Sequence, residues 1–180
     1  MKIRDIAAIA LFAAFITALG FIPPVFVPFF PAVPLSVHSM GPILAGACLG
    51  AKRGFYAVAL FWILLLAGLA FAGGSTGPAA FMGPMGGYIG GFGLAALIIG
   101  LAYHYWPHPI IAQEFLFMAV GGIIALYAAG IVWLMFLTKI SLTQALWLNA
   151  IFLPGDSAKI ILCIFIRRRL YRNAPHAFHP

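Results

Sequence analysis

Long apolar stretches alternate along the chain with short breaks that are rich in proline, glycine or charge. A stretch of about 20 predominantly apolar residues lets an α-helix cross the hydrocarbon core of a bilayer. Several stretches come close to this length, and the last of them begins at a Pro-Gly pair. The pattern therefore predicts six membrane-crossing helices, at approximately residues 6–22, 35–50, 55–72, 88–105, 115–137 and 154–172.

The breaks between these helices differ in character. Residues 23–34 are rich in proline and uncharged, so they are expected to run extended or to loop back rather than continue a helix. Residues 73–87 form a second uncharged loop of glycine, proline and small side chains. Residues 138–153 contain a helical-looking segment that is too short to cross a bilayer alone. Residues 51–54, Ala-Lys-Arg-Gly, are expected to form a tight basic turn.

Composition indicates an integral membrane protein. Of the 180 residues 64% are hydrophobic and only 7% are charged, and the mean hydropathy is +1.11. These values exclude a soluble globular domain, and apolar runs without period-2 alternation favour helices over a β-barrel. The predicted fold class is an all-α membrane protein, a bundle of six transmembrane helices that forms one integral membrane domain over residues 1–180.

The distribution of cationic residues predicts an orientation. Eight lysines and arginines fall on the side that holds both termini, whereas only Lys139 and Lys159 fall on the other side. By the positive-inside rule, both termini are predicted to be cytoplasmic, in a multi-pass protein of the plasma (inner) membrane. The loops 23–34, 73–87 and 138–153 then share the outer side. The net charge of +7 does not indicate nucleic-acid binding, because the sequence has no basic stretch interleaved with aromatic residues.

The sequence lacks the motifs of common catalytic sites. It has no Gly-x-x-x-x-Gly-Lys-Ser/Thr loop, and its three acidic residues provide no carboxylate cluster for a metal. Ser75 has no acidic neighbour with which to build a catalytic triad. Cys48 and Cys163 fall within apolar segments and are interpreted as packing residues. We therefore expect no enzymatic activity and no cofactor, and we interpret the first apolar run as a permanent helix rather than a cleaved signal.

Asp156 and Lys159 are the strongest candidates for function, because they lie three positions apart within an apolar run. Ionisable groups at membrane depth are costly and by default mark a ligand or ion site. Side chains at i and i+3 share one face of a helix, so the carboxylate and the ammonium can act together. The alternative is an intrahelical ion pair that only neutralises two charges. A ligand that needs both an acceptor and a donor explains the pair better, since two leucines would be less costly there.

Further candidate contacts come from the glycine-rich loop and from isolated polar residues. The loop would let backbone approach a small ligand closely, although a flexible turn also explains it. His38 is a candidate too, but a lone histidine there is more often a packed residue. A haem pair of His38 with His104 is disfavoured, because the two lie toward opposite membrane faces in the predicted topology. The predicted substrate-binding residues are Asp156, Lys159, Tyr88, Gly73, Gly74, Ser75, Gly86, Gly87, His38, Trp147 and Asn149.

Small residues at a spacing of four mark faces where helices approach each other closely. Such pairs occur in the fourth span, at Gly86 and Gly90 and again one residue later, and packing inside the bundle explains them. Ala10, Ala14 and Ala18 form a similar ladder on the first span. The first helix of a bundle is often peripheral, so this alanine ladder is the predicted docking face for an external partner.

Four motifs in the sequence form a recognisable set. They are Val33-Pro-Leu-Ser-Val-His38 with Ala45-Gly46, Ala72-Gly-Gly74, Gly83-Pro-Met-Gly-Gly-Tyr-Ile-Gly-Gly-Phe92 and Phe152-Leu-Pro-Gly-Asp-Ser-Ala-Lys159. Taken together, these motifs resemble the BioY family, the biotin-binding S-components of energy-coupling-factor (ECF) vitamin transporters. The resemblance covers about residues 30–170, and its last two motifs, in this order and at this spacing, are specific. The family usually has Gln where His38 stands and a polar residue where Met85 stands.

The resemblance implies a six-helix bundle that binds biotin near its outer surface. Asp156 would accept the ureido N–H groups of biotin, and Lys159 would either donate to the ureido oxygen or pair with the tail carboxylate. The alanine ladder would dock a transmembrane coupling protein driven by two ATPase subunits, with membrane lipids around the bundle. Two alternatives stay open: an S-component for a different vitamin, and a non-transport haem-binding, quinone-binding or structural membrane subunit.

Overall fold

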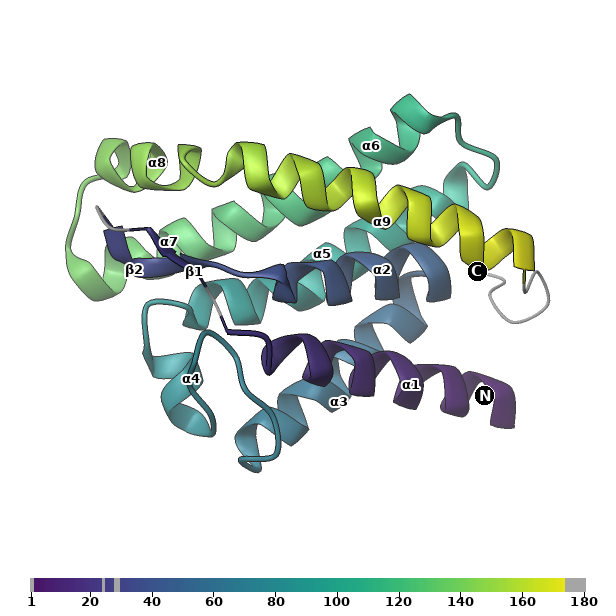
Figure 1. The fold of residues 1–180 in the computed structure, drawn as a ribbon, viewed down its shortest axis with the longest axis horizontal. Helices are drawn as coiled ribbons and strands as arrows, with labels where there is room; N and C mark the ends of the chain where they lie inside the picture. The colour runs from purple at the N-terminus through teal and green to yellow at the C-terminus, as the bar shows by residue number, and fades with distance from the viewer. Residues whose placement is uncertain (1, 24, 28–29, 174–180) are drawn as a thin grey trace.

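The computed structural model describes residues 2–23, 25–27 and 30–173. The described chain is mostly helical, and most of its helices run along the long axis of the molecule (Figure 1). Its elements are α1 (Ile3–Gly20), β1 (Val25–Val27), β2 (Phe30–Leu35), a 3-10 turn (Val37–Ser39), α2 (Met40–Leu49), α3 (Ala51–Leu66), α4 (Pro78–Met82), α5 (Gly86–Tyr105), α6 (Ile111–Ala119), a π-helical stretch (Val120–Ala125), α7 (Leu126–Thr138), α8 (Leu142–Ala150) and α9 (Leu153–Asn173).

The lengths of the helices suit a membrane protein. Three helical runs are long and apolar enough to cross a bilayer, namely Ile3–Gly20, Gly86–Tyr105 and the continuous run Ile111–Thr138. α8 and α9 meet the same criterion together, although the chain bends by 53° between them. Pro154 stands in the first turn of α9, where the missing N–H of a proline leaves no hydrogen bond unmade.

The structure corrects two of the expected boundaries. The predicted basic turn at residues 51–54 is wrong, because α3 already begins at Ala51 and the cationic side chains lie in its first turn. The chain reverses at Gly50 instead, where φ is 78°, a conformation that favours glycine. α3 also ends at Leu66 rather than at residue 72, and Gly68 follows it with φ of 79°.

Both uncharged loops contain regular structure. In the proline-rich stretch β1 pairs with β2 in an antiparallel hairpin, with Val25 opposite Leu35. The expectation for that stretch also covered residues 24, 28 and 29, which lie outside the described part of the chain. The glycine-rich loop contains the five-residue helix α4, which begins at Pro78.

α5 is the central helix of the bundle, since it packs against α2, α3 and α7. Glycine permits these close contacts. A Cβ atom on Gly100 would lie 2.2 Å from the backbone nitrogen of Ala51, and one on Gly46 would lie 2.5 Å from the carbonyl oxygen of Ala96. α5 therefore forms a close-packed support, and its N-terminal third carries side chains of the candidate site described below.

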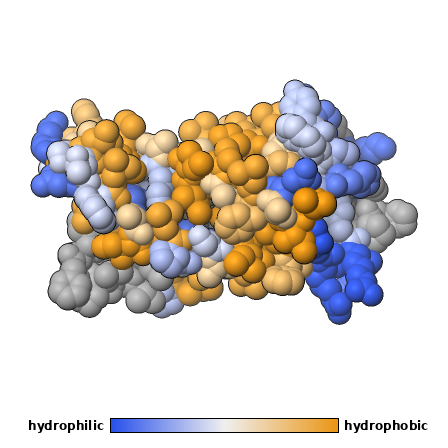
Figure 2. Space-filling model, turned by 90° about the horizontal axis from the view of Figure 1, so that it is seen from above, coloured by the Kyte–Doolittle hydropathy of each residue, from blue (hydrophilic) through white to orange (hydrophobic). Residues whose placement is uncertain are grey.

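The surface agrees with a membrane environment. Figure 2 shows apolar side chains across the middle of the molecule and hydrophilic side chains gathered toward its ends. The start of α1 and the end of α9 lie at the same end of the molecule (Figure 1). An apolar belt between two polar ends is the arrangement that a bilayer requires of a helical membrane protein.

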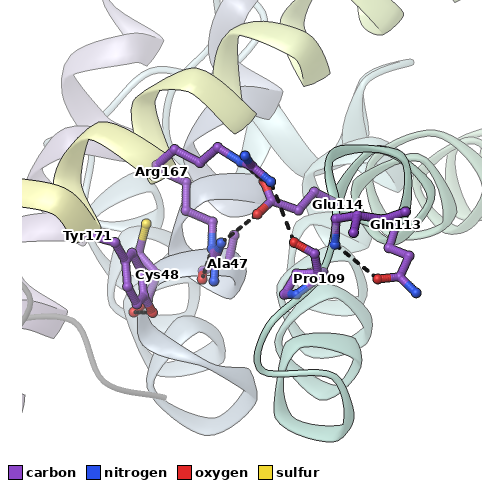
Figure 3. Close-up of polar contacts among 9 residues, drawn as sticks. Ala47, Cys48, Pro109, Gln113, Glu114, Arg167 and Tyr171 are labelled. Atoms are coloured by element: carbon purple, nitrogen blue, oxygen red, sulfur yellow. Dashed lines mark hydrogen bonds and ion pairs between the residues drawn. The ribbon is translucent and has the colours of Figure 1, made fainter.

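A buried ion pair fastens α9 to its neighbours near the end that holds the termini. Nη1 of Arg167 donates to the carboxylate of Glu114 on α6 at 3.0 Å, and Nε of Arg167 donates to the carbonyl oxygen of Ala47 on α2 at 3.0 Å (Figure 3). The side chain of Glu114 is only 2% exposed, and that of Arg167 only 8%. The guanidinium also stacks over the ring of Tyr103 at 3.8 Å. One side chain of α9 thus contacts α2, α5 and α6.

Removing only one partner of this ion pair should destabilise the protein. Glu114→Leu leaves the guanidinium of Arg167 buried without its carboxylate, a change that typically costs about 3–5 kcal/mol. Thermal unfolding of the purified protein in detergent should therefore shift to a lower temperature. The double variant Glu114→Leu/Arg167→Leu leaves no buried charge unpaired, because Arg168, the other partner of Glu114, is 42% exposed. It should therefore unfold at a higher temperature than the single variant. A single variant at least as stable as the double variant would contradict this account.

Candidate ligand-binding site

A narrow cavity is lined by the first turns of α5, α7 and α9. α5 and α9 begin in the half of the molecule away from the chain termini (Figure 1). The segment that precedes α2 and the end of α8 close its sides. The space open to the centres of water molecules is about 60 Å³. The lining residues are Ser36, His38, Ser39, Ala72, Gly73, Met85, Tyr88, Ile89, Phe92, Leu126, Tyr127, Asn149, Phe152, Asp156 and Lys159.

A hydrogen-bonded set of charged and polar groups forms one wall of the cavity. Asp156 lies in the first turn of α9, where a carboxylate is favoured by the helix dipole. Nζ of Lys159 donates to Oδ1 of Asp156 at 2.5 Å, and the hydroxyl of Tyr127 donates to Oδ2. Nζ of Lys159 also donates to the carbonyl oxygen of Ser36 at 2.6 Å. The side chains of Asp156 and Lys159 are 13% and 12% exposed, so the pair is largely desolvated.

A second polar pair lies deeper in the cavity. The hydroxyl of Tyr88 donates to Oδ1 of Asn149 at 2.6 Å, and Nδ2 of Asn149 donates to the carbonyl oxygen of Ala145 at 2.8 Å. Gly130 makes room for the tyrosine, because a Cβ atom there would lie 2.2 Å from Cε1 of Tyr88. Asn149 is therefore held in one orientation, and the oxygen of Tyr88 can still accept a hydrogen bond.

His38 adds a polar atom among aromatic rings. Its ring lies edge-on to those of Phe61 and Phe92, with centroids 5.0 and 5.1 Å apart. Its Nε2 is buried and has no hydrogen-bond partner among the described residues. A buried polar atom without a partner costs free energy, so a ligand that supplied one would be stabilised. His104 lies at the far end of α5, about 18 Å along the helix from Phe92 at 1.5 Å per residue, which rules out a shared haem.

The structure brings some of the sequence-predicted site residues together and separates others. Of the eleven, six line the cavity: His38, Gly73, Tyr88, Asn149, Asp156 and Lys159. Trp147 does not, and this residue is 73% exposed. Gly86 and Gly87 lie against Trp133 of α7 and serve the packing of α5. Gly74 and Ser75 belong to the turn closed by the pairing of Ala72 with Ser75, outside the lining.

Sequence reasoning missed several lining residues. Tyr127 could have been noticed as a hydroxyl within an apolar span, whereas Phe92 and Phe152 stand in the quoted motifs without a polar atom that would mark them as ligand contacts. Ser36 contributes a backbone oxygen, for which a sequence carries no signal. Among the described residues no group of three or more His, Cys, Asp or Glu side chains could hold a metal ion. The arrangement is suited instead to a small organic ligand with N–H donors, an acceptor and an apolar ring.

The alanine ladder lies on the surface of α1, outside the lining of this cavity. Ala10, Ala14 and Ala18 are all exposed on α1. The opposite face of the helix is buried in the bundle through Phe12 and Ile16. Among the described residues the ladder is not covered, so a helix of another protein can reach it.

Comparisons with known proteins connect this arrangement to one family. The model of the BioY family matches residues 1–176. The biotin transporter BioY of Rhizobium etli is 35% identical to the chain over 97% of both proteins. The biotin transporter BioY of Lactococcus lactis subsp. cremoris is 37% identical over 96% of this chain and 93% of its own. The crystal structure of the S-component for biotin from an ECF-type ABC transporter superposes with a TM-score of 0.88 at 34% identity, covering 95% of this chain and 92% of that one.

The fit of Tyr88 against Gly130 can be tested before any ligand is considered. Gly130→Ala should displace the tyrosine ring and lower the free energy of unfolding by about 1–3 kcal/mol, as overpacking does. Gly90→Ala is the matched control, because Gly90 is exposed, contrary to the packing expected from its spacing with Gly86, and a Cβ atom on it meets no atom within 4 Å. That variant should be as stable as the wild type or slightly more stable. Equal stability of the two variants in thermal unfolding would refute the described packing.

Proposed function

Because the chain belongs to the BioY family, we propose that it is the biotin-binding, substrate-capturing S subunit of an ECF-type biotin uptake transporter. The observation that carries this proposal is the desolvated Asp156–Lys159 pair in a cavity of aromatic side chains and glycine. Biotin presents ureido N–H donors, a ureido oxygen, an apolar bicyclic ring and an anionic tail. Each of these finds a complementary group in or beside the cavity.

Asp156 accepts the ureido N–H groups in this proposal. Lys159 donates either to the ureido oxygen or to the tail carboxylate, and its 2.5 Å contact with Asp156 supports the ureido oxygen. Charge-assisted hydrogen bonds of this kind are among the strongest in proteins. The unpartnered Nε2 of His38 and the hydroxyl of Tyr88 are further polar contacts for the ligand. The ring would pack against Phe92 and the backbone of Gly73.

Binding requires the cavity to widen, since about 60 Å³ is too little for a bicyclic ligand. The contact between Nζ of Lys159 and the carbonyl oxygen of Ser36 spans that space between α9 and the segment before α2. In our proposal the ligand displaces this carbonyl oxygen, so that Lys159 exchanges one oxygen acceptor for another. Such an exchange costs Lys159 little, because the number of hydrogen bonds that its ammonium donates is preserved.

The proposed topology has six membrane-crossing segments with both termini in the cytoplasm, in the plasma (inner) membrane. The positions of the termini at one end of the molecule support it, as do the eight cationic residues predicted for that side (Figure 1). The cavity then faces the outer side, from which a vitamin must be captured. The alanine ladder of α1 docks a transmembrane coupling protein, which two ATPase subunits drive.

Asp156→Asn should weaken biotin binding at least tenfold, because a charge-assisted hydrogen bond in a dry site contributes about 1.5–3 kcal/mol. Retention of radiolabelled biotin by the purified protein measures the affinity. Asp5→Asn is the matched control, since it removes the same charge on α1, outside the cavity, and should leave binding unchanged. A folded Asp156→Asn variant with unchanged affinity would remove Asp156 from the ligand site. A wild type that retains another vitamin and not biotin would overturn the proposed substrate.

Ala14→Leu should abolish ATP-driven uptake while leaving biotin binding by the isolated subunit intact. Bulk at Ala14 prevents the close helix approach that a ladder of small residues permits. Uptake of radiolabelled biotin is measured in cells that contain an intact coupling module. Ala128→Leu makes the same change on an exposed part of α7 and should transport normally. Normal uptake by the Ala14→Leu variant would contradict the docking role of the ladder.

A further inference from the structure

A groove lies on the surface between α6 and α9, which pack against each other (Figure 1). The space in it that is open to the centres of water molecules is about 510 Å³, far more than in the cavity described above. The two sites share no lining residue. We call this one the α6–α9 groove and define it by six of its lining residues: Ile111, Ala112 and Phe115 of α6, and Ile161, Phe165 and Arg168 of α9.

The walls of the α6–α9 groove are apolar and exposed. Ile111 is 60% exposed, Ile161 48% and Phe165 67%. The helical run that begins at Ile111 is long and apolar enough to cross a bilayer, so these side chains belong to the apolar belt. Arg168 is the one charged side chain in the lining. The groove therefore combines an apolar wall with a single cationic group.

Arg168 lies at the depth expected for lipid headgroups. Its Nη2 is 3.5 Å from the carbonyl oxygen of Pro109, in the loop between α5 and α6. The same loop carries Trp106, 55% exposed, directly after Tyr105, 71% exposed. Exposed tryptophan and tyrosine are enriched where a membrane meets water. Ile161 stands seven residues before Arg168, about 10 Å along the helix axis, so the groove runs from the headgroup level to the acyl chains.

The positive charge at Arg168 is only partly balanced by the acidic side chains of the protein. The sequence has three of them, all in the described part of the chain, and two pair with cations elsewhere. The third, Glu114, is shared by two arginines. Its Oε1 accepts from Nη1 of Arg167 at 3.0 Å, and its Oε2 accepts from Nε of Arg168 at 3.3 Å. One carboxylate thus serves two guanidinium groups, and the side chain of Arg168 stays 42% exposed beside the groove.

We propose that the α6–α9 groove binds an anionic phospholipid, with the phosphate of its headgroup at Arg168 and an acyl chain along the apolar walls. A guanidinium donates charge-assisted hydrogen bonds to phosphate oxygens, and basic sites between transmembrane helices bind anionic headgroups. A soluble anion would contact Arg168 and leave the apolar walls uncovered, whereas a phospholipid covers both. The site goes beyond the proposed transport function and does not depend on which ligand the cavity takes.

The test of the charge uses the full chain purified in an uncharged detergent and titrated with phosphatidylglycerol, with phosphatidylcholine as the zwitterionic comparison. Native mass spectrometry measures the lipid retained. The wild type should retain phosphatidylglycerol in preference to phosphatidylcholine. Arg168→Gln should weaken the retention of phosphatidylglycerol about fivefold, the effect of one cation near a membrane surface. Arg167 still pairs with Glu114 in this variant, and thermal unfolding measured in parallel reports that the variant is folded.

The matched control for the charge is Arg169→Gln, which removes an exposed cation one position along α9, outside the groove lining. It should retain phosphatidylglycerol as the wild type does. Equal losses in the two variants would reduce the effect to diffuse surface charge and overturn the proposal. Displacement of the lipid by millimolar glycerol 3-phosphate would also overturn it, because Arg168 would then be a site for a soluble anion.

The apolar wall is tested separately by Ala112→Trp, which fills the α6–α9 groove without changing the charge. It should weaken the retention of both phospholipids, because the acyl chain loses its contacts with the wall. Ala128→Trp makes the same change on an exposed part of α7 and should retain both lipids as the wild type does. Unchanged retention in the Ala112→Trp variant, together with loss of a dimer seen in the wild type, would assign the groove to a second copy of the chain and overturn the proposal.

Discussion

Charged groups inside a membrane bundle must be paired, and this constraint fixes the position of α9. Two of its cationic side chains donate to backbone oxygens of the segment that contains α2: Lys159 to Ser36 and Arg167 to Ala47. Each is also paired with a carboxylate, Asp156 in one case and Glu114 in the other. An unpaired charge at either position would cost several kcal/mol. α9 is therefore held against the segment that contains α2 at two positions, Lys159 and Arg167, which lie about 12 Å apart along the helix axis.

This fastening explains how a site can form between segments that are distant in the sequence. The wall with Asp156 and Lys159 comes from α9, whereas Tyr127 comes from α7 and Ser36 precedes α2. α5 supplies the opposing surface, and glycines let it approach its neighbours closely enough to carry Tyr88 into the cavity. Packing by small residues and pairing of buried charges thus act together, the first setting helix distances and the second setting helix register.

The two ends of the molecule have different chemistry. The end with the cavity has its opposite charges paired and desolvated, so it is suited to a small ligand that exchanges hydrogen bonds. The end with the termini carries the cationic side chains of Lys2, Arg4, Lys52 and Arg53 together with the carboxylate of Asp5. The exposed face of α1 runs between these ends with the alanine ladder. Ligand capture and partner docking are proposed for separate surfaces, so that each can be altered by substitution without the other.

The sequence by itself determined the membrane class, and the resemblance to the BioY family is confirmed. It also predicted the joint position of Asp156 and Lys159, because hydropathy and i,i+3 spacing are properties of a single segment. The limits of α3 were misjudged, since the turn at Gly50 depends on a backbone conformation that residues 51–54 do not reveal.

Only the tertiary structure decided which distant groups complete the site. The hydroxyl of Tyr127, the carbonyl oxygen of Ser36 and the pairing of Glu114 with Arg167 all join residues more than 25 positions apart. Trp147 and Asn149 are two positions apart in the sequence, yet one is exposed and the other is buried beside Tyr88. Such contacts depend on how helices pack against each other, and the local order of residues does not encode that packing directly.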